Sequence, residues 1–111
     1  MARVWYQVRD LEAARVFYRD LLGFTETYLA EDGWAKLDRG PMGIALAEGE
    51  PDGDGAVAVI DVDDIKAEVD RLRGEHVEVG TILELHGEVR MVDVFDPDGN
   101  RIQLVEPMRD T

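Results

Sequence analysis

The sequence repeats itself at a spacing of about half its length, and this constrains the fold more than any single motif. Val8-Arg9-Asp10-Leu11 matches Val62-Asp63-Asp64-Ile65 at an offset of 62 − 8 = 54 residues. Ile44-Ala45-Leu46-Ala47-Glu48 matches Ile102-Gln103-Leu104-Val105-Glu106 at an offset of 102 − 44 = 58 residues. A repeat of this kind indicates two copies of one supersecondary unit that bury their apolar faces together.

The clearest local signal is a hairpin over residues 91–106. Apolar Val92 and Val94 alternate with Asp93 and Phe95, which is typical of a strand with two different faces. The segment Asp96-Pro97-Asp98-Gly99-Asn100 follows. Because proline presets φ, aspartate bonds nearby amides and glycine accepts positive φ, this segment predicts a tight turn.

The first half of the chain predicts one strand, one helix and three further strands. Asp10 is a suitable N-cap, and Gly23 is suited to the left-handed position after a helix. The apolar residues between them recur at helical spacing. The expected elements are strands at 3–8, 24–30, 33–38 and 43–48 and a helix at 11–22.

The second half predicts the same order of elements. Asp63 or Asp64 caps a helix that starts near Ile65 and is closed by Gly74. Strands are expected at 56–62, 77–81, 82–85, 89–95 and 101–106. We therefore predict an α+β fold: a single domain of two βαβββ modules, 1–48 and 56–111, joined by the Gly-, Pro- and Asp-rich linker 49–55.

Charge and composition limit the classes of partner that the protein is expected to bind. The net charge of −13 argues against nucleic acid and anionic membranes, which repel such a surface, and it permits a cationic ligand. No apolar run approaches the roughly 20 residues of a membrane span. With no cysteine there is neither a disulfide framework nor a thiolate zinc site. The start of the chain lacks a signal-peptide pattern, so we expect a cytoplasmic location.

Three segments inside this doubled pattern carry a family resemblance. They are Val8-Arg9-Asp10-Leu11 with Phe17-Tyr18-Arg19-Asp20-Leu21-Leu22-Gly23-Phe24, then Val62-Asp63-Asp64-Ile65, and then Asp96-Pro97-Asp98-Gly99-Asn100-Arg101-Ile102-Gln103-Leu104. Together they resemble the vicinal oxygen chelate superfamily of glyoxalase I, the bleomycin- and fosfomycin-resistance proteins and the extradiol dioxygenases. The resemblance implies two mixed sheets that curl into an open cup, with the helices on the outside.

The resemblance also implies where a metal ion would be bound in such a cup. Carried over by motif and repeat, the four ligand positions are Arg3, Ala45, Val57 and Gln103. Ala45 and Val57 offer no donor atom, and the guanidinium of Arg3 has no lone pair to offer. We therefore expect no divalent metal cofactor. A displaced site that uses His76, His86 or Glu88 is the alternative.

Alternation along the strands predicts the side chains that face the cup. Trp5 and Trp34 are suited to stacking on a planar or cationic group. Arg3 is suited to a carboxylate or phenolate oxygen, and Asp93 either accepts from an amine or pairs with Arg3. The other interpretation of the two tryptophans is a place in the core or in a dimer interface. The predicted ligand-binding residues are Arg3, Trp5, Gln7, Trp34, Val57, Met91, Asp93 and Gln103, with Ala45, Val59 and Phe95 nearby.

These residues favour a metal-free protein of the resistance type that sequesters a small organic molecule, aromatic or cationic. The alternative is an enzyme, namely a lyase, isomerase or dioxygenase of the superfamily with a non-standard or displaced metal centre. A third interpretation is a degenerate member whose role is to pair with another protein. We expect a homodimer, as is common among small members of the family. The sequence leaves open whether the cup forms within one chain or between two.

Overall fold

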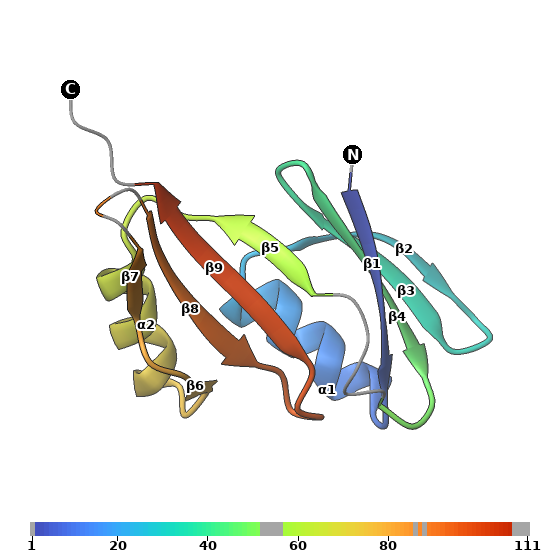
Figure 1. The fold of residues 1–111 in the computed structure, drawn as a ribbon. Helices are drawn as coiled ribbons and strands as arrows, with labels where there is room; N and C mark the ends of the chain where they lie inside the picture. Colours follow the sequence, from blue (N-terminus) through green and yellow to red (C-terminus); the bar gives the residue numbers. More distant parts are fainter. Residues whose placement is uncertain (1, 52–56, 86, 88, 108–111) are drawn as a thin grey trace.

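Two open mixed sheets, each covered on one face by a helix, make up the fold (Figure 1). The structure is a computed structural model that describes residues 2–51, 57–85, 87 and 89–107. Sheet 1 has the strand order β1-β4-β3-β2; sheet 2 has the order β5-β9-β8-β6, and β7 pairs with β8. The elements are β1 (Ala2–Val8), α1 (Leu11–Val16), η1 (Phe17–Leu21), β2 (Thr25–Ala30), β3 (Trp34–Arg39), β4 (Met42–Glu48), β5 (Ala58–Asp61), α2 (Ile65–Gly74), β6 (Glu78–Val79), β7 (Leu83–Leu85), β8 (Val89–Phe95) and β9 (Arg101–Pro107).

The strands pair in the same register in both modules, which confirms the predicted α+β fold of two repeats. In each module the first strand lies parallel to the last strand. Trp5 of β1 pairs with Ala45 of β4, and Val59 of β5 pairs with Gln103 of β9. These pairs are related by the same offsets of 54 and 58 residues that relate the sequence repeats. The repeat therefore holds at the level of single residues.

The predicted helix starts are confirmed at both caps. The side chain of Asp10 accepts a hydrogen bond from the backbone N–H of Ala13 at 3.1 Å. The side chain of Asp64 accepts one from the backbone N–H of Ala67, also at 3.1 Å. Each carboxylate satisfies a donor that the first helical turn leaves without a partner.

The helix ends differ from the prediction in two places. The first helix is α-helical only to Val16 and continues as the π-helical turn η1, with the N–H of Leu22 bonded to the carbonyl of Phe17. The second helix passes through Gly74, and His76, not a glycine, takes the left-handed conformation with φ of 64°. The bond from Val77 N–H to Leu72 carbonyl closes this end and places His76 at the position after the cap.

The middle of the second module has less strand than the alternation predicts. The expected strands at 77–81 and 82–85 shrink to β6, two residues long, and β7, three residues long. The second module thus keeps the five predicted strands, β5 to β9, which is one more than the βαβββ order of the first module. The predicted linker lies outside the described residues at 52–56, as do His86 and Glu88. No helix in the described ranges is long and apolar enough to cross a membrane.

The core occupies the helix-covered faces of both sheets. Along β1 the buried residues alternate with exposed Trp5 and Gln7, as the period of two requires. The same alternation separates buried Ala58 and Ile60 of β5 from exposed Val59. One hydrophobic cluster runs through both modules; its largest fully buried members include Tyr18, Leu22, Leu37, Ile44, Leu46, Ile65, Leu72, Ile102 and Leu104.

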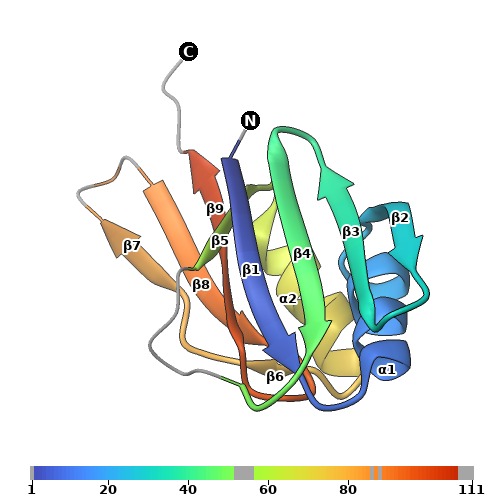
Figure 2. The same ribbon diagram turned by 90° about the vertical axis from the view of Figure 1, so that its right-hand side faces the viewer.

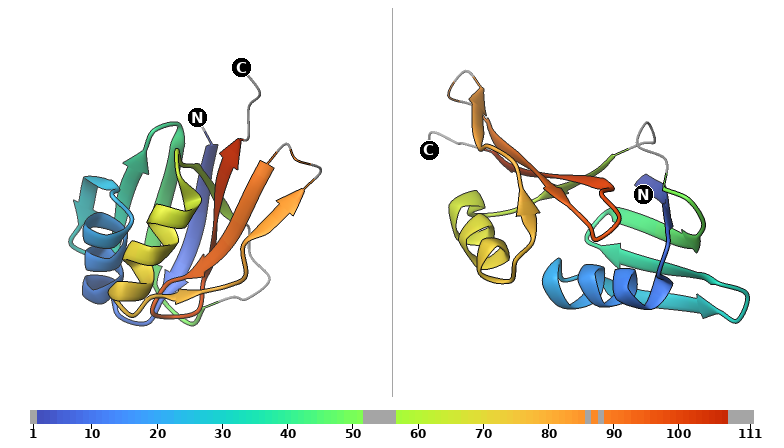
Figure 3. Two further views of the ribbon diagram at one scale, coloured as in Figure 1. Left: turned by 90° about the vertical axis from the view of Figure 1, so that its left-hand side faces the viewer. Right: turned by 90° about the horizontal axis from the view of Figure 1, so that it is seen from below.

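The helices lie together in the angle between the two sheets. Figure 2 shows β1, β4, β3 and β2 side by side in that order, with both helices behind them. The view from below in Figure 3 shows α1 beside sheet 1 and α2 beside sheet 2, near each other. The Arg71 side chain of α2 donates to the carbonyl of Leu21 at 2.7 Å across this junction. The helix-free faces of the two sheets are therefore turned away from each other.

The carboxylate of Asp96, in the turn between β8 and β9, joins the modules. It is 5 % exposed and accepts from the backbone N–H groups of Asp98 and Asn100 at 2.9 Å. Its second oxygen accepts from the Asn100 amide at 2.9 Å and from the hydroxyl of Tyr18 at 2.8 Å. The Asn100 amide also donates to the carbonyl of Gln7 in β1. The predicted turn thus holds the first module through two of its residues.

Removal of the Tyr18 hydroxyl is expected to destabilise the protein. Tyr18→Phe deletes a buried hydrogen bond to a carboxylate, which costs about 1.5–3 kcal/mol. The matched control is Tyr28→Phe, because Tyr28 is 51 % exposed and its change should alter the free energy of unfolding by less than about 0.5 kcal/mol. Urea unfolding measures both. Equal stability of the two variants would contradict the role of this bond.

Alkaline pH is expected to destabilise the protein through Tyr6. Burial raises the pKa of Tyr6 from 10.0 to about 12. The unfolded chain therefore loses this proton first. The contribution of Tyr6 to the free energy of unfolding should be constant below pH 10 and fall by about 2–3 kcal/mol as the pH rises to 12. Urea unfolding at each pH tests this, and Tyr6→Phe should reduce the slope above pH 10. An unchanged slope in the variant would contradict the assignment.

Candidate functional site

The helix-free face of sheet 1 carries three aromatic side chains, and we call it the aromatic face. Trp5 of β1 is 57 % exposed and Tyr28 of β2 is 51 % exposed. The half-buried ring of Trp34 in β3 lies 5.0 Å from that of Tyr28, tilted by 48°. The aromatic face consists of Trp5, Gln7, Tyr28, Trp34, Lys36, Ala45 and Ala47.

Strand register explains how these side chains are arranged. Ala45 of β4 pairs with Trp5 on one side and with Lys36 on the other, and Lys36 pairs with Tyr28. The small side chain of Ala45 is therefore flanked by much larger ones on the neighbouring strands. The ammonium of Lys36 lies 5.5 Å from the centroid of the Trp34 ring. This is the geometry of a cation–π contact.

The helix-free face of sheet 2 is more polar at its centre. The Asp93 carboxylate of β8 lies 3.5 Å from the side-chain amide of Gln103 and 3.5 Å from the guanidinium of Arg101. Val59, 41 % exposed, is the register partner of Gln103. Because Asp93 is engaged by Arg101, its charge is partly balanced within its own sheet.

The structure separates the predicted ligand residues into two groups. Trp5, Gln7 and Trp34 lie on sheet 1, while Asp93 and Gln103 lie on sheet 2. Half-buried Met91 pairs with Val105 on sheet 2, and half-buried Val57 immediately precedes β5. Arg3 pairs through its backbone with Gly43, and its side chain lies outside the described part of the structure. Phe95 instead lines a separate cleft of about 340 Å³, with Phe17 and Leu21.

Sequence reasoning missed three contributors to these faces. Lys36 follows Trp34 by two residues, so the period of two along β3 contained the signal. Arg101 is the register partner of Phe95 and precedes Gln103 by two residues, so the alternation along β9 contained its signal as well. Tyr28 follows a register irregularity after Glu26, which shifts its side chain relative to simple alternation.

The four family metal positions do not form a suitable donor set. Ala45 and Val57 present only hydrocarbon, and the side-chain amide of Gln103 lies near Asp93. A divalent ion needs several imidazole, thiolate or carboxylate donors. Among the described residues, no group of three or more His, Cys, Asp or Glu is arranged to hold a metal ion. His76, one member of the alternative displaced site, is exposed at the end of α2.

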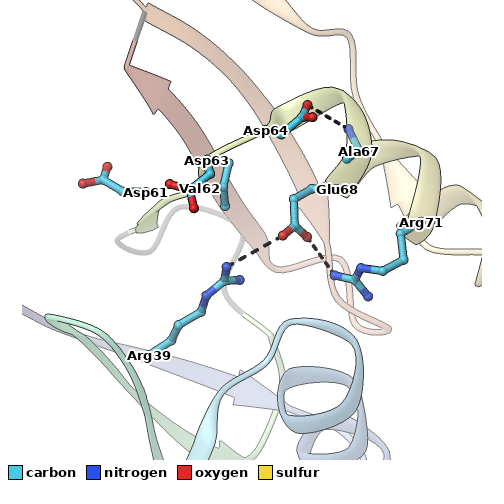
Figure 4. A pocket seen from close by; sticks show the side chains of 8 residues that line it. All are labelled: Arg39, Asp61, Val62, Asp63, Asp64, Ala67, Glu68 and Arg71. Carbon is cyan, nitrogen blue, oxygen red and sulfur yellow. Dashed lines mark hydrogen bonds and ion pairs between the residues drawn. The ribbon is translucent and has the colours of Figure 1, made fainter. Parts of the chain in front are cut away.

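A charged cleft of about 310 Å³ lies where the two modules meet (Figure 4). Glu68 of α2 bridges Arg71, at 2.8 Å, and Arg39 of β3, at 3.8 Å. Arg39 also donates to the carbonyl of Leu22 at 2.8 Å. Both guanidinium groups are therefore engaged in joining the modules. The lining residues are Arg39, Asp61, Val62, Asp63, Asp64, Ala67, Glu68 and Arg71.

The fold, the doubled strand register and the turn at Asp96 together define the class of protein. The profile of the Glyoxalase/Bleomycin resistance protein/Dioxygenase superfamily matches residues 1–104. The chain belongs to this superfamily. No curated protein matches the chain.

Solved structures with a similar fold include both binding proteins and enzymes. An integron cassette protein from the mobile metagenome of the Halifax Harbour sewage outfall is 20% identical, with 96% of this chain and 97% of that chain covered and a TM-score of 0.83. The antibiotic-binding protein TnmS3 of a Streptomyces species is 25% identical, with coverage of 96% and 94% and a TM-score of 0.79. Lactoylglutathione lyase of Agrobacterium tumefaciens is 20% identical, with coverage of 96% and 92% and a TM-score of 0.79.

Proposed function

We propose that this protein binds a small organic molecule with a planar aromatic ring, without a metal ion, and thereby sequesters it. The binding surface is the aromatic face. The observation that carries the proposal is the gathering of Trp5, Tyr28 and Trp34 on one helix-free sheet face. Planar rings stack favourably on such side chains, and the tryptophan side chain loses little conformational entropy when it binds a ligand.

Two further observations support a binding role. The donor set at Ala45, Val57 and Gln103 does not suit a divalent ion, so the proposed interaction is between organic groups. TnmS3, which shares the fold at 25% identity, is described as an antibiotic-binding protein. Sequestration of an aromatic natural product by this chain is consistent with that likeness.

The second part of the proposal is that two copies of the chain pair. The helix-free faces of one chain are turned away from each other, so neither covers the other (Figure 3). Both expose apolar side chains, since Trp5 is 57 % exposed, Val59 41 % and Leu83 53 %. Apolar surface of this kind is stabilised by burial. Pairing of sheet 1 of one copy with sheet 2 of the other encloses the aromatic face in a cleft.

Neutral 2-naphthol is expected to bind to the aromatic face. The chain has two tryptophans, so NMR resolves two indole N–H signals, which Trp5→Phe and Trp34→Phe assign. Titration with 2-naphthol should shift both signals, and the shifts should be the same after removal of metal ions with a chelator. The expected dissociation constant is on the order of 0.1–1 mM, as suits a small unoptimised ring.

The control for this titration compares two exposed apolar residues. Trp5→Ala should weaken 2-naphthol binding about tenfold, whereas Val16→Ala on the surface of α1 should leave it unchanged. Val16 is 39 % exposed and lies on a helix, remote from the aromatic face. Shifts that appear only after zinc, nickel, manganese or iron is added would overturn the metal-free proposal. The absence of any shift would overturn the binding surface itself.

Pairing of two copies is expected to depend on Val59. In sedimentation experiments the wild-type chain should behave as a dimer. Val59→Asp places a charge on the helix-free face of sheet 2 and should produce a monomer, because an unpaired charge is costly to bury. Val16→Asp, on the helix side, should remain a dimer. A wild-type chain that sediments as a folded monomer would contradict the pairing.

A further inference from the structure

Among the described residues of the aromatic face, Lys36 is the one that carries a positive charge. It is one of two lysines in the chain, and it lies half-buried in β3 with its ammonium 5.5 Å from the centre of the Trp34 ring. The register places Ala45 beside it on β4, and Trp5 beside Ala45 on β1. Neighbouring strands are spaced by about 4.8 Å, so the backbones of Lys36 and Trp5 lie about 10 Å apart.

The surroundings of Lys36 differ from those of most described arginines. The chain has 25 acidic residues against 12 basic ones, and most described arginines pair with a carboxylate. No ion pair between Lys36 and a carboxylate is present among the residues that the structure describes. Its described side-chain contact is the Trp34 ring. In so acidic a chain, this leaves the ammonium available to an anion from outside.

We propose that Lys36 makes the aromatic face selective for anionic aromatic molecules, such as those that carry a ring carboxylate or phenolate. This inference rests on the proposed function and names the class of ligand. Ala45 is 5 % exposed beneath its larger neighbours, so a ring stacked on Trp5 places its substituent above Ala45 and toward the ammonium of Lys36. A carboxylate or phenolate there gains a charge-assisted hydrogen bond. A cationic ring is repelled by Lys36, and it finds the face of Trp34 already occupied by an ammonium.

The proposed preference for an anion is opposite to the one expected from the net negative charge of the protein. The net charge of −13 attracts cations at long range, whereas the contact with Lys36 acts at short range. At physiological ionic strength, charges more than about 8 Å apart are largely screened. Under these conditions the local contact should decide which ligand binds more tightly. Added salt should therefore preserve or increase the preference for an anion.

Two probes with one ring and opposite charges test the inference. They are 2-naphthoate and 2-naphthylmethylammonium, titrated at physiological ionic strength while the two indole N–H signals are followed by NMR. The wild-type chain should bind the naphthoate about tenfold more tightly, since attraction of one probe and repulsion of the other both contribute. Lys36→Gln should abolish the preference. Lys66→Gln, which removes the other lysine, on α2, should retain it.

The outcomes separate this inference from the proposed function. If 2-naphthol still binds but the naphthoate is not preferred, or if Lys36→Gln keeps the preference, the selectivity is overturned and the binding surface stands. If neither 2-naphthol nor either charged probe binds, the proposed function falls as well. If Lys36→Gln instead turns a wild-type dimer into a monomer and leaves the probe preference unchanged, Lys36 serves the contact between copies and the inference is overturned.

Discussion

The structure depends on a single buried carboxylate at the end of a strand. Asp96 accepts four hydrogen bonds, three from its own turn and one from Tyr18 in the other module. The turn is thereby rigid, and it is attached to the first module at the same time. A buried carboxylate without these donors would be strongly unfavourable. Local turn structure and the docking of the modules thus share one carboxylate, since three of its donors belong to the turn and the fourth to the other module.

Much of this fold was predictable because its signals are local and occur twice. The caps Asp10 and Asp64, the alternation along β1 and β8, and the turn after Asp96 each follow from neighbouring residues. Their repetition at nearly constant offsets makes the βαβββ order recognisable. The candidate site was less predictable. Alternation correctly separates Trp5 and Trp34 from the core, but it contains no sign of the register irregularity before Tyr28 or of the left-handed conformation of His76.

The placement of the two faces depends on contacts that no local pattern contains. Glu68 bridges Arg39 and Arg71 where the modules meet, and Tyr6 joins β1 to the second module through Ala58 and Arg101. These polar contacts hold the helices in the angle between the sheets, with the helix-free faces outward (Figure 1). The predicted ligand residues consequently divide between two surfaces. The core as a whole fixes the position of each helix-free face, although the outward side chains of that face contribute little to the core.

The matched register of the modules has an evolutionary consequence. Trp5 and Ala45 occupy in the first module the places that Val59 and Gln103 occupy in the second. The backbones are equivalent, while the outward side chains have diverged into an aromatic surface and a polar one. Because every outward position alternates with an inward one, mutations that retune recognition leave the interior intact. In such a scaffold the chemistry of each exterior can change separately, at little risk to folding.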